Sequence, residues 1–245
     1  MEVDAMAHQK IGKIMSGTLL LEGGAEFGGR MADPDREALI AAGGPSAAVV
    51  VIPAAAAPDH NAERAGQNAV RWFRHLGALQ VERLPLVDRT SADDPAIADR
   101  LLKARLIYLL GGFPAHLARS LQDSRSWQAA LQAYGSGAVI AGSSAGAMVL
   151  CSDYFDPVGK TVNHGLGLIA RTCVLPHHES VGRRWVAVIQ KVLPDRVLMG
   201  IDEETGALTH GTQNYWQVYG KGRVTLYRED RVRVFGPGQP FRLDD

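Results

Sequence analysis

The sequence has few cysteines, no net charge and no long apolar run, and each of these shortages excludes a class of protein. Among its 245 residues the cysteines are Cys151 and Cys173, which are too few for a disulfide framework and lack the spacing of metal ligands. Lys plus Arg and Asp plus Glu number 26 each, so no net field favours nucleic acid or an anionic membrane. No stretch approaches the roughly 18 continuous apolar residues of a membrane span, and residues 1–13 lack the basic and apolar regions of a signal peptide. We therefore expect a cytoplasmic protein with no nucleic-acid or membrane partner.

Short apolar runs alternate with stretches of helical composition over the first 141 residues. The apolar runs are residues 17–22, 47–52, 79–86, 106–110 and 137–141, and the helical stretches are residues 62–76, 95–104 and 115–134. Runs that are apolar throughout are typical of strands buried on both faces. Strands that alternate with helices predict right-handed βαβ units, and hence an α/β fold with a mostly parallel sheet and helices on both faces.

The pattern changes after about residue 195. Strand-like runs at residues 197–208, 215–219, 223–227 and 231–235 are separated by turns, several of which contain glycine. Closely spaced strands of this kind predict antiparallel hairpins, here at one edge of the sheet. The chain has no internal repeat, low-complexity tract or obvious linker, so we expect one domain over residues 1–245, with residues 1–14 as a flexible or edge segment.

Several predicted strands end in glycine. These are Gly23-Gly24, Gly111-Gly112 and Gly142. In an open parallel sheet the carboxyl ends of the strands form the ligand-binding edge, and glycine lets the backbone approach a ligand closely. Each glycine alone could serve only a tight turn, but three at the same edge favour a binding site.

Residues 142–146, Gly-Ser-Ser-Ala-Gly, follow one of these strands and lead into a helix-like segment. This is the context of a nucleophile elbow, in which a tight turn lifts a serine hydroxyl above the sheet. Ser144 occupies the nucleophile position, and Ser143 lies one residue off the pattern. The N–H groups that follow such a turn face a developing oxyanion, so we expect Ala145 N–H as the first donor and Gly112 N–H as the second.

A serine nucleophile needs an imidazole base and a carboxylate that orients it. His177 follows a short strand-like run at residues 173–175 and would emerge at a strand end, whereas its neighbour His178 would point to the other side. His177, His178 and Glu179 do not have the spacing of a zinc motif, so we expect no metal. Residues 200–205 contain three adjacent acids after another apolar strand, and two earlier acids compete with them. The candidates are Asp202, Glu203, Glu204, Asp153 and Asp156.

Taken together, these segments resemble the peptidase family of cyanophycinases and aspartyl dipeptidases. The resemblance is carried by residues 142–147, 165–168, Pro176-His177 and 200–203, and also by residues 21–26 and 218–222, in the family's order. It implies a fold like that of class I glutamine amidotransferases, which is flavodoxin-like, with serine in place of cysteine. It also implies Ser144 as nucleophile, His177 as base, and Gly112 with Ala145 as oxyanion hole. The cyanophycinase-like members imply Glu203 as the acid, whereas the aspartyl dipeptidases imply Asp153 or Asp156.

The chain also departs from the family pattern. Cyanophycinases typically have Gly-Gly-Asp-Gln where residues 111–114 are Gly-Gly-Phe-Pro, and Asp-Gln-His-Phe where residues 175–178 are Leu-Pro-His-His. The missing polar groups help to hold a β-aspartyl-arginine unit, so the resemblance implies a divergent member with a more apolar pocket at Phe113 and Leu175. Arg183 and Arg184 partly match arginines that follow the family's histidine. The residues expected at the substrate are Gly24, Glu26, Phe113 and Arg183.

The leading hypothesis is a serine exo- or dipeptidase that cleaves an amide bond in a small peptide or isopeptide through an acyl-enzyme, without a cofactor. The predicted edge strands at the carboxyl terminus would allow a homodimer. One alternative is an esterase with the chain order Ser, acid, His, which would use Asp202 or Glu203 as acid and His210 as base. A second alternative is an inactive member that binds a small molecule.

Overall fold

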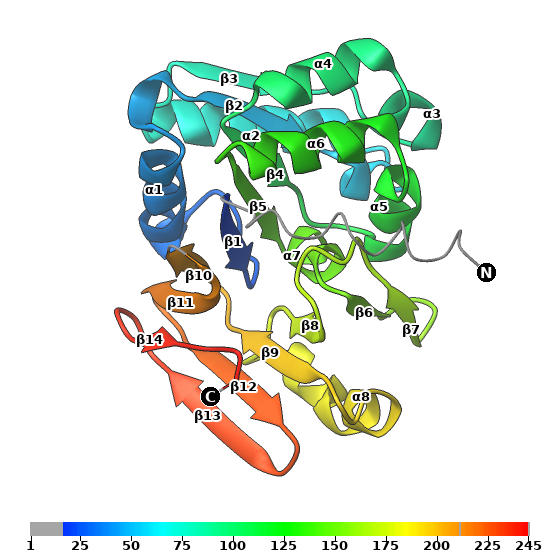
Figure 1. Ribbon diagram of the computed structural model, residues 1–245, viewed down its shortest axis with the longest axis vertical. Coiled ribbons are helices and arrows are strands. Elements are labelled where there is room, and N and C mark those ends of the chain that lie inside the picture. The colour runs from blue at the N-terminus through cyan, green and yellow to red at the C-terminus, as the bar shows by residue number, and fades with distance from the viewer. Residues whose placement is uncertain (1–16, 211, 245) are drawn as a thin grey trace, which may run out of the picture.

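The computed structural model describes residues 17–210 and 212–244, and its main feature is an eight-stranded sheet with the order β14-β11-β10-β1-β5-β4-β2-β3 (Figure 1). The five parallel strands are β1 (Thr18–Glu22), β2 (Ala48–Ile52), β3 (Gln80–Arg83), β4 (Leu106–Leu109) and β5 (Val139–Ser143). Three antiparallel strands extend the sheet beyond β1, namely β10 (Thr205–His210), β11 (Thr212–Gly220) and β14 (Pro240–Phe241). The predicted mostly parallel sheet is therefore confirmed.

Helices cover both faces of this sheet, as the βαβ pattern predicts. Helices α1 (Ala32–Ala41) and α2 (Ala62–His75) pack on one face, and the other face carries α3 (Arg89–Ala92), α4 (Pro95–Lys103), α5 (Pro114–Leu121), α6 (Arg125–Gly135) and α7 (Ala145–Leu150). Alternate residues of one strand serve the two faces: Leu20 packs with α1 and α2, whereas Leu19 and Leu21 pack with the other group. The strands are apolar throughout because both of their faces are buried.

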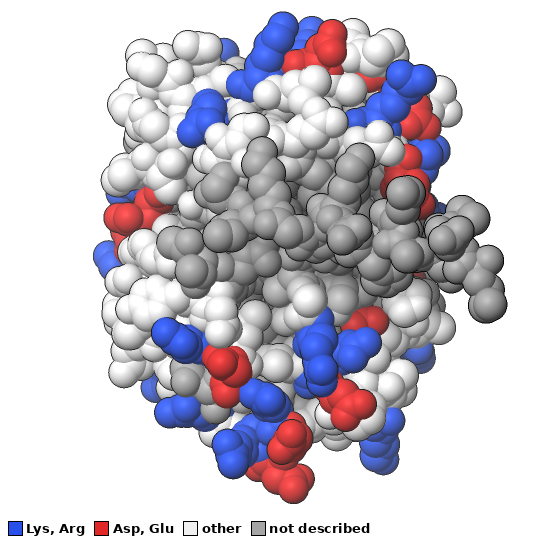
Figure 2. Space-filling view, in the orientation of Figure 1, with Lys and Arg blue, Asp and Glu red and all other residues white. Residues whose placement is uncertain are grey.

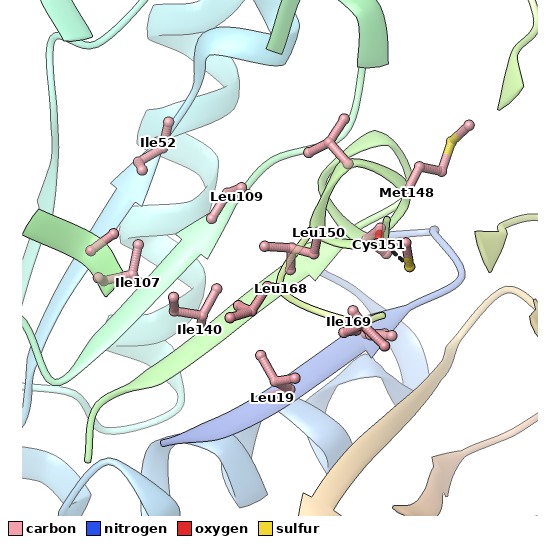
Figure 3. Close-up of a cluster of buried hydrophobic side chains, with 14 of the residues drawn as sticks. Leu19, Ile52, Ile107, Leu109, Ile140, Met148, Leu150, Cys151, Leu168 and Ile169 are labelled. Atoms are coloured by element: carbon pink, nitrogen blue, oxygen red, sulfur yellow. Dashed lines mark hydrogen bonds between the residues drawn. The ribbon is translucent and has the colours of Figure 1, made fainter. Parts of the chain in front are cut away.

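The larger of the two main cores lies beneath α7. Figure 3 shows part of it, where Leu19, Ile107 and Ile140 of the strands lie in one cluster with Leu150 of α7 and Leu168. All but Leu168 are fully buried. Burying such a side chain stabilises the fold by roughly 1.5–3 kcal/mol, so the short helix α7 is fixed firmly against the sheet.

A second sheet with the order β13-β12-β9-β8 lies in the lower part of Figure 1. Its strands are β8 (Thr172–Leu175), β9 (Val197–Ile201), β12 (Val224–Arg228) and β13 (Arg231–Phe235). Helix α8 (Val186–Val192) packs on it, and a separate hairpin, β6 (Asp153–Asp156) with β7 (Thr161–His164), contributes Phe155 to the same small core.

Two predictions about the elements are wrong in detail. Residues 197–208 form β9 and β10 in different sheets, because the polar turn between them includes Glu204 at φ 51°, so the carboxyl-terminal strands do not all join one edge. Residues 115–134 form two helices, because Asp123 adopts φ 56° and Ser124 starts a new helix by accepting a hydrogen bond from Trp127 N–H at 3.0 Å. Helix α1 and the β6–β7 hairpin were not predicted.

The surface carries charges of both signs. On the face shown in Figure 2, basic side chains (blue) and acidic side chains (red) lie close to one another. No helix in the part of the chain that the structure describes is both long and apolar enough to cross a membrane. The segment predicted to be flexible or at an edge, residues 1–14, lies outside the described residues.

Candidate active site

Ser144 lies at the turn between β5 and α7, in a strained backbone conformation. Its φ of 49° and ψ of −112° are rare for a residue with a side chain. Such a conformation costs on the order of 1–3 kcal/mol and persists only where its surroundings enforce it. Here Ser144 N–H donates to Glu22 O of the neighbouring strand at 3.0 Å, and Ser144 O accepts from Met148 N–H at 3.0 Å.

The two glycines of the motif allow this turn to pack tightly. A Cβ added to Gly142 would lie 2.5 Å from the carbonyl carbon of Gly146, and one added to Gly146 would lie 2.2 Å from Leu109 O. Both contacts are with backbone that cannot move aside cheaply. The spacing of small residues that marks the motif in the sequence is therefore a packing requirement of the strand-to-helix turn.

His177 joins Ser144 to a carboxylate. Its Nε2 lies 3.0 Å from Ser144 Oγ, and its Nδ1 lies 2.7 Å from Glu203 Oε1. An ionised carboxylate can only accept a hydrogen bond, so it favours the tautomer with the proton on Nδ1. Nε2 is then free to accept the proton of the serine hydroxyl. The side chains of His177 and Glu203 are 34% and 42% exposed, so the chain of groups opens toward solvent.

The backbone around His177 fixes the position of its ring. His177 follows β8, adopts φ 48°, and donates its N–H to Gly23 O at 2.7 Å. A Cβ added to Gly24 would lie 2.2 Å from His177 Cε1, so this glycine makes room for the imidazole. Gly24 was predicted to lie at the substrate, and the structure places it against the histidine.

Glu203 is held by a second glutamate. Its backbone N–H is within 2.9 Å of both carboxylate oxygens of Glu179. Glu203 lies in the turn between β9 and β10, next to the loop that carries His177. Glu179 was not predicted to take part, although it adjoins the two histidines in the sequence.

The other candidate acids contact other groups. Asp202 contacts the His178 ring and accepts a hydrogen bond from Arg223 N–H. Glu204 accepts from Arg30 N–H and from Lys221. Asp153 accepts from Arg196 and Ser152, and Asp156 accepts from Val158 N–H. Among the described residues, Glu203 is thus the carboxylate that contacts His177.

The structure does not bring His210 to the serine. Strand β10 runs antiparallel to β1 with Glu22 opposite Gly206 and Leu20 opposite Leu208. His210 therefore lies toward the amino end of β1, whereas Ser144 follows Ser143, which is opposite Glu22. The esterase hypothesis, which required His210 as base, is inconsistent with this arrangement.

Two backbone N–H groups remain available near the serine. Ala145 is the first residue of α7, so its N–H has no acceptor within the helix. Gly112 adopts φ +135°, a conformation that favours glycine, and a Cβ there would lie 2.3 Å from Ala55 O. No acceptor for Gly112 N–H occurs in residues 17–210 or 212–244. Both groups have the free donor that an oxyanion hole needs.

Ser144, His177 and Gly112 line two cavities of different character. The larger cavity has a volume of about 470 Å³ and is mostly polar, with Glu26, Asp59, Asn61, Arg64, Asn68 and Phe113 in its wall. The smaller has a volume of about 120 Å³ and is apolar, with Met148, Phe155, Leu175, Val181 and Trp185 in its wall. Glu26 and Phe113, which were predicted to lie at the substrate, are thus in the wall of the larger cavity beside Ser144.

Arg183 lies elsewhere. It is the second residue of a short turn after His178, to whose carbonyl it donates its N–H at 3.1 Å, and it lines a separate hollow with Asp202 and Tyr227. It contributes to neither cavity at Ser144. The family resemblance implied Arg183, because it partly matches an arginine that follows the histidine in cyanophycinases, but in this structure Arg183 lies in the 3-10 turn over Gly182–Trp185 and faces the other hollow.

A buried pair of acids, Glu22 and Asp35, lies near the turn that carries Ser144, whose N–H donates to Glu22 O. Tyr108 Oη donates to Glu22, and Trp72 Nε1 donates to Asp35 Oδ2 at 2.7 Å. The two remaining carboxyl oxygens, Glu22 Oε1 and Asp35 Oδ1, are buried and have no hydrogen-bond partner among the described residues, and the two carboxyl groups interact with each other. Burial raises the pKa of Glu22 and raises that of Asp35 to about 7, so the pair can share a proton. The sequence gives one signal of this pair, a glutamate at the end of an otherwise apolar strand.

The chain is similar to one peptidase family, to cyanophycinases in sequence, and to solved peptidase structures in fold. The model of Peptidase family S51 matches residues 19–214. Cyanophycinase of Trichormus variabilis is 31% identical over 198 residues, which cover 76% of this chain and 64% of that protein. Cyanophycinase of Geminocystis herdmanii is 29% identical over 197 residues, or 76% of this chain and 71% of that protein. The chain thus spans less than two thirds of the length of the Trichormus relative.

Two solved structures have the same fold. A peptidase from an acI-B1 Actinobacterium superposes with a TM-score of 0.83 at 28% identity, covering 94% of this chain and 98% of that one. A protein described as a peptidase E from Listeria monocytogenes EGD-e superposes with a TM-score of 0.57 at 18% identity, covering 89% and 98%. The second likeness bears on the fold alone.

Proposed function

The chain belongs to peptidase family S51, and from that premise we propose that it hydrolyses an amide bond of a small peptide or isopeptide through an acyl-serine intermediate. The observation that carries this proposal is the chain of contacts from Ser144 Oγ through His177 to Glu203, which opens into two cavities. The base His177 lies within hydrogen-bond distance of both the nucleophile and the orienting acid, which is the arrangement that acyl transfer requires.

In the first half of the reaction, Ser144 Oγ attacks the carbonyl carbon of the substrate while its proton passes to His177 Nε2. The carbonyl oxygen becomes an oxyanion that accepts hydrogen bonds from Ala145 N–H and Gly112 N–H. His177 then gives the proton to the amide nitrogen as the carbon–nitrogen bond breaks, and the amine leaves. Each oxyanion donor of this kind accelerates such reactions by roughly 10²–10³.

In the second half, water attacks the acyl carbon and its proton passes to His177 Nε2. The bond to Ser144 Oγ breaks, the serine recovers the proton, and the carboxylic acid product leaves. Throughout, Glu203 keeps the Nδ1 proton in place and stabilises the imidazolium that forms in each half. No cofactor is needed for any of these steps.

Labelling with a fluorophosphonate probe tests this proposal, because the probe reacts with an activated serine. We expect the wild-type protein to gain one adduct on Ser144 and Ser144→Ala to gain none. Ser143→Ala is the matched control, since Ser143 is fully buried and its Oγ has no hydrogen-bond partner among the described residues. An adduct on Ser144→Ala would overturn the assignment. A wild-type protein that takes no label would favour the inactive small-molecule binder.

A further inference from the structure

The two cavities meet at the groups that would bind the reacting carbonyl. Ser144, His177 and Gly112 belong to both walls, and the remaining wall residues come from different elements. A carbonyl at Ser144 therefore has a polar space on one side and an apolar space on the other. The substrate residues on the two sides of a scissile bond would therefore contact different surroundings, one mostly polar and one apolar.

The apolar cavity has the size of one side chain. Its volume is about 120 Å³, and an apolar cavity of about 150 Å³ holds a benzene molecule. Phe155 and Trp185 form one wall with their ring centroids 4.7 Å apart. Apart from His177, none of the described residues in its wall is ionisable. A polar or charged side chain entering this space would lose its hydration without gaining a partner.

The polar cavity contains a carboxylate without a partner. Glu26 is half-buried and makes no hydrogen bond or ion pair with any described residue. A Cβ added to Gly111 would lie 2.4 Å from Glu26 Oε1 and 3.2 Å from Ser144 Cβ, so the carboxylate and the nucleophile flank the same backbone position.

The other charged groups of this cavity leave Glu26 unpaired. Asp59 adds a second negative charge, and Arg64 directs its Nε to Asn61 Oδ1 at 3.1 Å. A cationic group of the substrate would supply the missing partner. In a peptide the nearest such group to a scissile carbonyl is the free ammonium of the same residue.

We propose that the substrates are short peptides with a free amino terminus whose first peptide bond is cleaved and whose second residue has a large apolar side chain. Glu26 binds the ammonium group of the first residue, and the apolar cavity receives the side chain of the second. This inference rests on the proposed function, and it names the class of substrate for that site.

The test compares four dipeptides, Ala-Leu, Ala-Phe, Ala-Ser and Ala-Asp, with acetyl-Ala-Leu. We expect kcat/KM for Ala-Leu and Ala-Phe to exceed that for Ala-Ser and Ala-Asp at least about tenfold, since one side chain in an apolar pocket gives discrimination of roughly 10- to 200-fold. Acetylation of the amino terminus should lower kcat/KM by at least about tenfold. Equal turnover of apolar and polar second residues, or of free and acetylated peptides, would overturn the proposal.

Two variants tie the selectivity to the cavities. Val181→Lys places a charge in the apolar wall, and the 49% exposure of this side chain lets the fold accept it. It should reduce the preference for Ala-Leu over Ala-Ser, whereas Val188→Lys, at a 52% exposed position of α8 outside the cavity, should not. Glu26→Gln should lower kcat/KM for Ala-Leu at least about tenfold more than kcat/KM for acetyl-Ala-Leu, and the exposed Glu63→Gln is its control and should change neither.

A loss of selectivity in both lysine variants would argue against the apolar cavity as its source. The inference and the proposed function fail in different ways. If Ser144 is labelled by the fluorophosphonate but the dipeptides show no such selectivity, this inference is wrong and the nucleophile stands. If Ser144 is not labelled, the proposed function itself is wrong.

Discussion

Two adjacent histidines of this protein each connect a hydroxyl group to a carboxylate, and the two resulting chains of hydrogen-bonded side chains, called here the His177 chain and the His178 chain, run in different directions. His177 links Ser144 Oγ at 3.0 Å with Glu203 at 2.7 Å, and His178 links Tyr227 Oη at 3.0 Å with Asp202 at 3.3 Å. Each is a hydroxyl, an imidazole and a carboxylate in order. Their surroundings differ, because the His177 side chain is 34% exposed and that of His178 is 7% exposed.

The difference shows what such a chain needs beyond its three groups. Ser144 lies on a strained turn, lines two cavities, and has the free N–H groups of Ala145 and Gly112 beside it. Tyr227 is in the middle of a sheet, and burial raises the pKa of its hydroxyl. We infer that the His178 chain joins β8, β9 and β12 as a buried polar cross-link, and that the His177 chain performs the chemistry.

The largest expected effect comes from removing the base of the proposed catalytic chain. His177→Ala should lower kcat by about 10⁴–10⁶, the range found when single members of a serine-hydrolase triad are removed. Dipeptide turnover measures this loss. His210→Ala is the control and should retain activity, because His210 lies at the other end of the sheet. Equal losses in both variants would contradict the assignment of the base.

The next effect tests the acid. Glu203→Gln should lower kcat by about 10²–10⁴, because an amide no longer holds the productive tautomer of the imidazole. The turnover assay is the same, and Glu204→Gln, which removes a carboxylate bound to Lys221 instead, should have little effect. A larger loss in Asp153→Asn than in Glu203→Gln would transfer the role to the acid that aspartyl dipeptidases suggest.

The buried histidine should affect stability more than activity. His178→Ala leaves Tyr227 Oη and Asp202 without their imidazole partner in a closed site, so the free energy of unfolding should fall by about 2–4 kcal/mol. Urea unfolding measures this change. The folded fraction should keep kcat within about tenfold of the wild type. A loss of kcat as large as that of His177→Ala would show that the two chains do not have separate roles.

The sequence predicts the parts of this site that depend on local pattern. The glycines and the serine of residues 142–146 follow from one strand-to-helix turn, and His177 follows from the short strand before it. The α/β fold follows from apolar runs alternating with helices. These features need only neighbouring residues, so a single sequence contains the information.

The sequence leaves open the parts that depend on how distant segments pack. Three adjacent acids could each have reached His177, and the turn with Glu204 at φ 51° selects Glu203. Phe155 and Trp185 meet only because the β6–β7 hairpin packs on the loop before α8. The resemblance implied a more apolar pocket at Phe113 and Leu175. Leu175 does line the apolar cavity with Phe155 and Trp185, whereas Phe113 lies in the wall of the larger, mostly polar cavity.

The smallest expected effect is a change in stability, and it concerns the buried pair of Glu22 and Asp35. In this pair two carboxyl groups interact without a histidine between them. The pKa of Asp35 is raised to about 7 in the folded protein, against about 3.9 in an unfolded chain. Between these values the unfolded state loses its proton first, so this group costs stability as the pH rises from about 4 to 7. Asp35→Asn removes that cost and keeps an acceptor for Trp72 Nε1. We expect a gain of about 1–3 kcal/mol at pH 8 and only about a quarter of that gain near pH 4.5.

Urea unfolding of both proteins across this pH range measures the difference. The carbonyl of Glu22 accepts Ser144 N–H through the backbone. The carboxyl groups of the pair make no hydrogen bond to Ser144, His177 or Glu203 among the described residues, so kcat should remain within a few-fold. A gain that does not depend on pH would mean that the pair holds no shared proton. A large loss of kcat in Asp35→Asn would mean that the buried acids, and not only the His177 chain, control the position of the serine.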